Sequence, residues 1–149
     1  MIKKLVCCIA LFALGGKSWA TDLDAAVDAR QRPNILFLLA DDLGWADVGF
    51  HDSDKLTPNI DRLAETGVRF EQHYVWPTCS PTRVAFLTGR EPSRFGVYTP
   101  LGDVGIPTTT MTLPAALRNS GYATHIAGKW HLGAPPEYRP LRFGFDTSY

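Results

Sequence analysis

The sequence has no surplus of charge of either sign, few cysteines, no internal repeat and no low-complexity segment. Its 149 residues hold 15 Lys and Arg against 15 Asp and Glu, and three cysteines. This balance gives no basic surface for nucleic acid or for an anionic membrane, so any anion-binding site must be local. With 45% hydrophobic and 20% charged residues, the composition is typical of a globular chain with one modest core.

A hydrophobic run long enough to span a membrane is also missing. The apolar stretch Leu5 to Leu14 follows Lys3 and Lys4, and small residues precede a cleavage point after Ala20. This pattern is typical of a secretory signal peptide. A membrane anchor is the alternative, but the stretch is shorter than the roughly 20 residues of a spanning helix. We therefore expect cleavage of residues 1–20, a periplasmic or secreted protein, and no stable membrane association afterwards.

Cleavage would leave a single cysteine in the chain. Cys7 and Cys8 would leave with the signal peptide, so Cys79 would be alone in an oxidising compartment and could form no internal disulfide. Such a thiol is buried and inert, paired with another molecule, or used chemically, and composition leaves these three alternatives open. Cleavage also removes three lysines and no acid, so 12 basic residues would face 15 acidic ones.

After a polar linker at 21–32, the rest of the chain alternates predicted strands and helices. Short apolar runs predict strands, and N-cap residues, prolines and terminal glycines predict helices. The alternation indicates an α/β fold with a mostly parallel sheet, where ligands bind beyond the carboxyl ends of strands. Asp41, Asp42 and Lys129 follow such ends. The predicted strands are Ile35–Leu39, Val68–Tyr74 and Tyr122–Ala127, and the predicted helices begin at Thr57-Pro58, at Ser80-Pro81 and at Leu113 and end near Gly67, Gly89 and Gly121.

Three segments resemble the sulfatase family. Pro77-Thr78-Cys79-Ser80-Pro81-Thr82-Arg83 is similar to the family's CxPxR signature, a segment at 34–49 contains LADDLGWADVG, and one at 121–133 contains GKWHLG. The resemblance covers 33–149 and is closest to arylsulfatases of the N-acetylgalactosamine-4-sulfatase (arylsulfatase B) type. It implies that 33–149 is the N-terminal portion of a sulfatase catalytic domain. The implied fold is a truncated alkaline-phosphatase-like α/β/α sandwich with a mostly parallel sheet.

The resemblance implies that Cys79 is oxidised to formylglycine by a maturation enzyme. One hydroxyl of the hydrated aldehyde would attack the sulfur of a sulfate ester, and deprotonation of the other would later expel sulfate. Arg83 would hold the hydrate, Lys129 would contact the substrate sulfate, and His131 would handle the hydroxyl proton. The predicted helix start adds a partial positive charge beside Cys79. Without the resemblance, Arg83 reads as a surface arginine that pairs with a carboxylate.

The resemblance also implies a calcium site. Asp41, Asp42 and residue 79 would be ligands, since calcium takes several oxygen ligands. From spacing alone, adjacent acids at a strand end are more typical of a helix cap or a solvated turn. The remaining histidines are predicted to be structural, and the tryptophans are predicted to be core or pocket wall. These residues are His51, His73 and His125, and Trp45, Trp76 and Trp130.

Family members are several hundred residues long, and the part beyond Tyr149 would bring further metal ligands, a histidine and a lysine. We therefore expect an incomplete fragment with little or no turnover of its own. The leading hypothesis is hydrolysis of aryl or glycan sulfate esters. A phosphonate or phosphate monoester hydrolase of the same superfamily is the enzymatic alternative, which turnover of nitrophenyl sulfate against nitrophenyl phosphate would separate. The second alternative is a non-catalytic module that binds sulfated glycans.

Overall fold

The computed structural model describes residues 32–102 and 105–149. The chain divides into two compact units, one containing the described residues 32–74 and the other containing the described residues from Val75 to Tyr149. The predicted signal peptide at 1–20 lies outside the described residues, as does the predicted linker except for Arg32. Among the described residues, no helix is long and apolar enough to cross a membrane.

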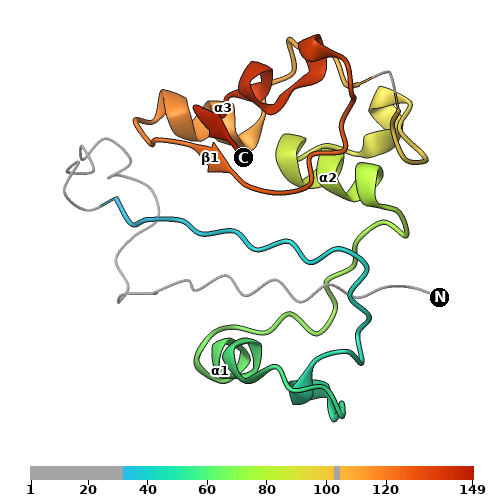
Figure 1. The fold of residues 1–149 in the computed structure, drawn as a ribbon, viewed down its shortest axis with the longest axis vertical. Helices are drawn as coiled ribbons and strands as arrows, with labels where there is room; N and C mark the ends of the chain where they lie inside the picture. The colour runs from blue at the N-terminus through green and yellow to red at the C-terminus, as the bar shows by residue number, and fades with distance from the viewer. Residues whose placement is uncertain (1–31, 103–104) are drawn as a thin grey trace, which may run out of the picture. The chain divides into compact units, whose positions relative to one another are not determined.

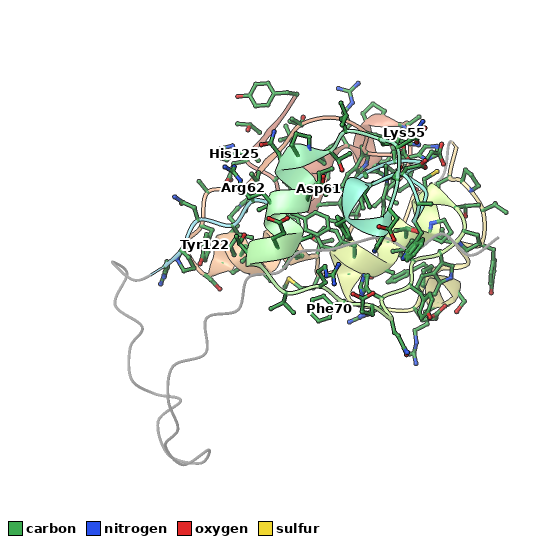
Figure 2. All side chains as sticks on the ribbon, turned by 90° about the horizontal axis from the view of Figure 1, so that it is seen from below. Lys55, Asp61, Arg62, Phe70, Tyr122 and His125 are labelled. Atoms are coloured by element: carbon green, nitrogen blue, oxygen red, sulfur yellow. The ribbon has the colours of Figure 1, made fainter. Side chains whose placement is uncertain are left out.

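The first unit contains one α-helix in its described part. α1 (Pro58–Thr66) begins after Thr57, has proline at its first position and ends at Gly67, as the sequence predicted. A short 3-10 helix, η2 (Gly49–His51), is joined to its start. Thr57 Oγ1 accepts from the Gly49 amide at 2.8 Å. Asp61, which projects from α1 (Figure 2), accepts from the Phe50 amide through Oδ1 at 3.0 Å. These bonds satisfy turn amides that would otherwise need water.

The predicted strand Ile35–Leu39 is wrong for this structure. The segment forms no strand (Figure 1). Leu36 and Leu38 in it are 83% and 70% exposed. An apolar run becomes a strand only when a neighbouring strand takes up its backbone hydrogen bonds and other side chains cover its faces. The prediction for Val68–Tyr74 fails in the same way, because only Tyr74 makes a bridge.

The described part of the second unit contains two α-helices and a parallel strand pair (Figure 1). The helices are α2 (Cys79–Thr88) and α3 (Leu113–Asn119). The predicted strand Tyr122–Ala127 shortens to β1 (His125–Ile126), which pairs in parallel with β2 (Thr147–Ser148), a strand the sequence did not predict. Three 3-10 helices complete the unit: η3 (Pro92–Phe95), η4 (Pro136–Tyr138) and η5 (Pro140–Phe143).

α2 begins two residues earlier than predicted. The sequence pointed to Ser80 as the N-cap and Pro81 as the first helical residue, but Thr78 is the N-cap and Cys79 the first residue. The prediction fails because the Ser80 side chain bonds elsewhere, to the backbone of His131. The other end is as predicted, since Gly89 closes the helix in the left-handed conformation at φ 62°.

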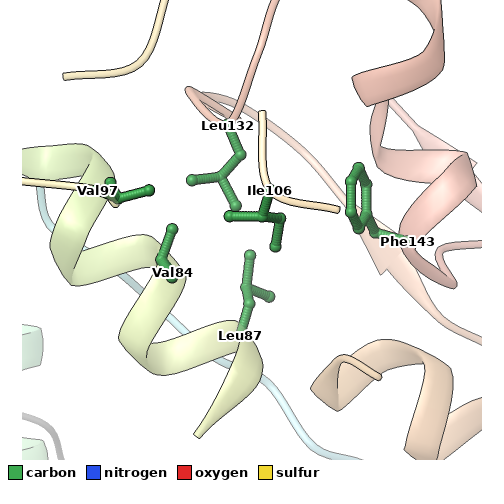
Figure 3. Close-up of a cluster of buried hydrophobic side chains, with 6 residues drawn as sticks. All are labelled: Val84, Leu87, Val97, Ile106, Leu132 and Phe143. Carbon is green, nitrogen blue, oxygen red and sulfur yellow. The ribbon is translucent and has the colours of Figure 1, made fainter. Parts of the chain in front are cut away.

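A compact hydrophobic core lies beneath α2 in the second unit. Side chains of the helix meet apolar residues from loops and from η5 (Figure 3). Since the helix contributes its buried face to this cluster, its N-terminal residues are held in a fixed place relative to the loop that carries Leu132. The buried members of the cluster are Val84, Leu87, Val97, Ile106, Leu132 and Phe143.

Candidate active site

The site is built on the first turn of α2. Cys79 is half-buried, and its sulfur lies 3.0 Å from Nδ1 of His131, which is 52 residues further along the chain. At this distance the thiol and the imidazole share a hydrogen bond. The structure therefore brings together two of the residues that the sequence proposed for catalysis.

The loop that carries His131 is anchored on both sides of the histidine. Trp130 Nε1 donates to the Tyr138 carbonyl at 2.6 Å, and its ring lies 5.4 Å from that of Phe143. Leu132 on the other side is fully buried in the core. The prediction that Trp130 is a core or wall residue is confirmed. His131 itself has φ 60°, so the loop turns sharply at this residue and points its ring back to α2.

Arg83 and Lys129 also meet, but through the backbone of the lysine. Arg83 lies one turn after Cys79 on α2, and its Nη1 donates to the Lys129 carbonyl. This bond holds the start of the 129–133 loop against the helix. The predicted contacts of Arg83 with residue 79 and of Lys129 with a sulfate stay predictions. The alternative of a surface arginine that pairs with a carboxylate stays open beside this bond.

The start of α2 is electrostatically suited to an anion. The first amides of a helix have no partner within the helix and carry a partial positive charge. The side chain of the N-cap residue, Thr78, makes no capping bond. The backbone carbonyl of Thr78 accepts from Thr82 Oγ1 at 2.9 Å, which tightens the first turn. An anion at this end would lie beside residue 79.

The two aspartates belong to the first unit. Asp41 and Asp42 are exposed in a bend, and Asp42 has φ 59°. Two adjacent carboxylates are hard oxygen donors, and they would supply part of the six to eight ligands of calcium. Within the described residues, no three His, Cys, Asp or Glu side chains gather in a way that could hold a metal. Asp41 and Asp42 therefore do not form a metal site with other described residues of these types, and their role as calcium ligands stays a prediction.

Two of the remaining histidines have structural partners. His51 Nδ1 bonds to the Trp45 carbonyl at 2.6 Å and its ring stacks on the Trp45 ring. His125 Nδ1 lies 2.6 Å from Thr147 Oγ1, a bond across the β1–β2 pair. These contacts agree with the predicted structural roles of both histidines.

The comparison with protein families decides the identity of this arrangement. The sulfatase family profile matches residues 33–149, the range over which the sequence resembles it. The chain belongs to the sulfatase family. Within this sulfatase chain, the CxPxR segment corresponds to the first turn of α2 and the GKWHLG segment to the loop that ends beside it.

Similar proteins are sulfatases with several names. The chain is 47% identical over 131 residues to an N-acetylgalactosamine-6-sulfatase of Sus scrofa, covering 79% of this chain and 25% of that protein. It is 38% identical over 160 residues to arylsulfatase J of Mus musculus, covering 95% and 27%. The chain thus spans about a quarter of the length of the curated relatives it matches. Similarity to sulfatases is confirmed, whereas these relatives carry other names than the predicted N-acetylgalactosamine-4-sulfatase type.

Solved structures match part of this fold. Ps i-CgsB superposes with a TM-score of 0.69 at 43% identity, covering 73% of this chain and 26% of that one. The PsFucS1 sulfatase from Pseudoalteromonas sp. gives a TM-score of 0.66 at 38% identity, covering 72% and 23%. The matches and the parallel β1–β2 pair agree with part of an α/β fold.

The sequence did not point to Ser80 as a residue of the candidate site. Ser80 was interpreted as a helix cap, but it is fully buried and its Oγ lies 3.3 Å from Nδ1 of His131. The available signal was a polar residue next to Cys79. Its partner could not be read from the sequence, because His131 lies 51 residues away.

Proposed function

We propose that this chain supplies the nucleophile and its proton-transfer partner in a sulfuric ester hydrolase that acts on aryl or glycan sulfate esters. The observation that carries the proposal is the 3.0 Å contact between Cys79 Sγ and His131 Nδ1 at the start of α2. The names of the relatives support the substrate class, since they include an N-acetylgalactosamine-6-sulfatase and arylsulfatases. The narrower likeness to arylsulfatase B remains part of this proposal.

In the proposed reaction, the Cys79 thiol occupies the place of a formylglycine side chain made by a maturation enzyme. When hydrated, this group supplies an oxygen nucleophile that an unmodified thiol lacks. The amides at the start of α2 bind the negative charge of the sulfate. His131 Nδ1 shares a proton with residue 79, and Arg83 holds the Lys129 backbone so that the lysine ammonium stays near the anion.

Calcium is part of the proposal through the two adjacent aspartates. Asp41 and Asp42 would hold the ion with carboxylate oxygens. When bound, the ion would supply positive charge that favours binding of a sulfate ester. We also propose that the chain forms part of an alkaline-phosphatase-like α/β/α sandwich with a mostly parallel sheet. Like the calcium site, this proposal rests on membership of the sulfatase family.

The decisive experiment is mass spectrometry of the Cys79 peptide. The 149-residue chain is expressed with and without a formylglycine-generating enzyme, digested with trypsin, and treated with an aldehyde-reactive hydrazide. We expect the peptide at 70–83 to lose its sulfur, gain an aldehyde oxygen and react with the hydrazide only when the enzyme is present. Cys79→Ala is the matched control. An unaltered thiol after expression with the enzyme would contradict the proposed function.

A further inference from the structure

Ser80 lies on the first turn of α2 and contacts the loop that carries His131. It is the second residue of α2, its side chain is fully buried, and its Oγ makes three polar contacts. It donates to the His131 carbonyl at 2.7 Å, accepts from the Leu101 amide at 2.9 Å, and lies 3.3 Å from His131 Nδ1. A buried hydroxyl with this many partners is fixed in place.

The three contacts can be assigned donors and acceptors. A serine hydroxyl has one hydrogen and two lone pairs. The His131 carbonyl only accepts, so the hydroxyl hydrogen points to it, and the Leu101 amide occupies one lone pair. The second lone pair faces Nδ1 of His131. This contact is favourable when the imidazole nitrogen carries the hydrogen, because two facing lone pairs repel each other.

The backbone of His131 needs such a restraint. Its φ of 60° lies in the left-handed region, which non-glycine residues adopt rarely and at a cost. The hydrogen bond from Ser80 is made to the carbonyl of this same residue. One side chain therefore fixes both the strained backbone of His131 and the rotation of its ring.

We propose that Ser80 is a positioning residue that holds His131 in its left-handed conformation and directs a proton-bearing Nδ1 at residue 79. The role in catalysis rests on the proposed function, but the placement does not. In this arrangement the neutral ring begins as a hydrogen-bond donor toward residue 79, and its Nε2 is the nitrogen without a proton. Among the described residues, the other contact of His131 Nδ1 is with the sulfur of Cys79.

The test is nuclear magnetic resonance of the unmodified chain with Cys79 as a thiol. At about pH 7.5, where an ordinary imidazole is mostly neutral and an ordinary thiol is mostly protonated, we expect the ¹⁵N pattern of His131 to show the proton on Nδ1. We also expect an Overhauser contact between the Cys79 β-protons and the His131 ring. In Ser80→Ala both signals are lost, and exchange of the Leu101 amide accelerates about fivefold or more, the factor for an ordinary hydrogen bond.

Ser120→Ala is the matched control, since this serine also donates to a backbone carbonyl, that of Ala116 at 3.1 Å, but far along the chain from α2. It should leave the His131 signals unchanged. Unchanged Nδ1 protonation and an intact Cys79–His131 contact in Ser80→Ala would overturn the proposal. Where Ser80→Ala does not fold, the wild-type spectrum decides, because a proton on Nε2 instead of Nδ1 overturns it. Conversion of Cys79 to formylglycine is measured separately, so failure of the proposed function is distinguishable.

Discussion

At the scale of single residues, the sulfur of Cys79 contacts the imidazole of His131 and is not enclosed by apolar side chains alone. The thiol is half-buried and bonded to His131, so it is not the buried, inert cysteine that was one of the three alternatives from the sequence. Arg83 acts nearby on the loop backbone. The chemistry of the site therefore depends on a few side chains whose positions are fixed by hydrogen bonds to backbone carbonyls.

Asp146 gives a residue-scale prediction about acid stability. A hydrogen bond from the Thr124 amide, and further a bond from its hydroxyl and the Arg118 charge, hold the pKa of this carboxyl below its ordinary value of 3.8. A lowered native pKa stabilises the fold above the unfolded value, and the contribution is lost as pH falls below 3.8 through the native value. Asp146→Asn should remove this part of the acid dependence.

Urea denaturation at a series of pH values from 6 down to about 2.5 checks this expectation, over the range in which carboxyl groups titrate. Wild type should lose free energy of unfolding more steeply than Asp146→Asn at the acid end. Asp54→Asn, which changes an exposed carboxylate of the first unit, is the control and should follow wild type. Parallel curves for wild type and Asp146→Asn would contradict the assignment.

At the scale of elements, the helices are defined by their ends. α1 begins with proline after Thr57, α3 begins after Thr112, whose hydroxyl accepts from the Ala115 amide, and α2 ends at Gly89. These signals lie within a few residues of the backbone groups they satisfy. Strands behave differently, because β1 exists only through its pairing with β2, which lies about twenty residues later.

The left-handed C-cap of α2 leads to a prediction at this scale. Gly89 has φ 62°, and no atom lies within 4 Å of the position where a Cβ would be added. Gly89→Ala should therefore cost about 1 kcal/mol in free energy of unfolding through backbone strain alone. Gly89→Asn should cost less, because asparagine adopts this conformation more readily. Urea denaturation of the three proteins measures the difference, and equal stability of Gly89→Ala and wild type would contradict it.

At the scale of the whole molecule, the second unit depends on one small core. Six buried apolar side chains link α2 to η5 and to the loop that carries His131 (Figure 3). Residues of the core directly follow residues of the site in the sequence, since Leu132 follows His131 and Val84 follows Arg83. Loss of packing in the core is therefore expected to loosen the site.

Phe143 is the most informative core residue to change. It is 2% exposed, and Phe143→Ala should lower the free energy of unfolding by about 3–5 kcal/mol, the usual cost of a large cavity. Leu141→Ala in the same 3-10 helix is the matched control, because Leu141 is 51% exposed and should cost well under that amount. Urea denaturation checks both. Equal losses for the two variants would show that Phe143 is not part of a cooperative core.

The sequence by itself determined the features that depend on neighbours a few residues apart. The bounds of α1, the end of α2, the place of Cys79 at a helix start and membership of the sulfatase family follow from local residues and motifs. Only the tertiary structure decided that His131 Nδ1 meets Cys79, that Arg83 holds the Lys129 carbonyl, and that Ile35–Leu39 forms no strand. Contacts between residues some fifty positions apart depend on the path of the chain, which local preferences leave open.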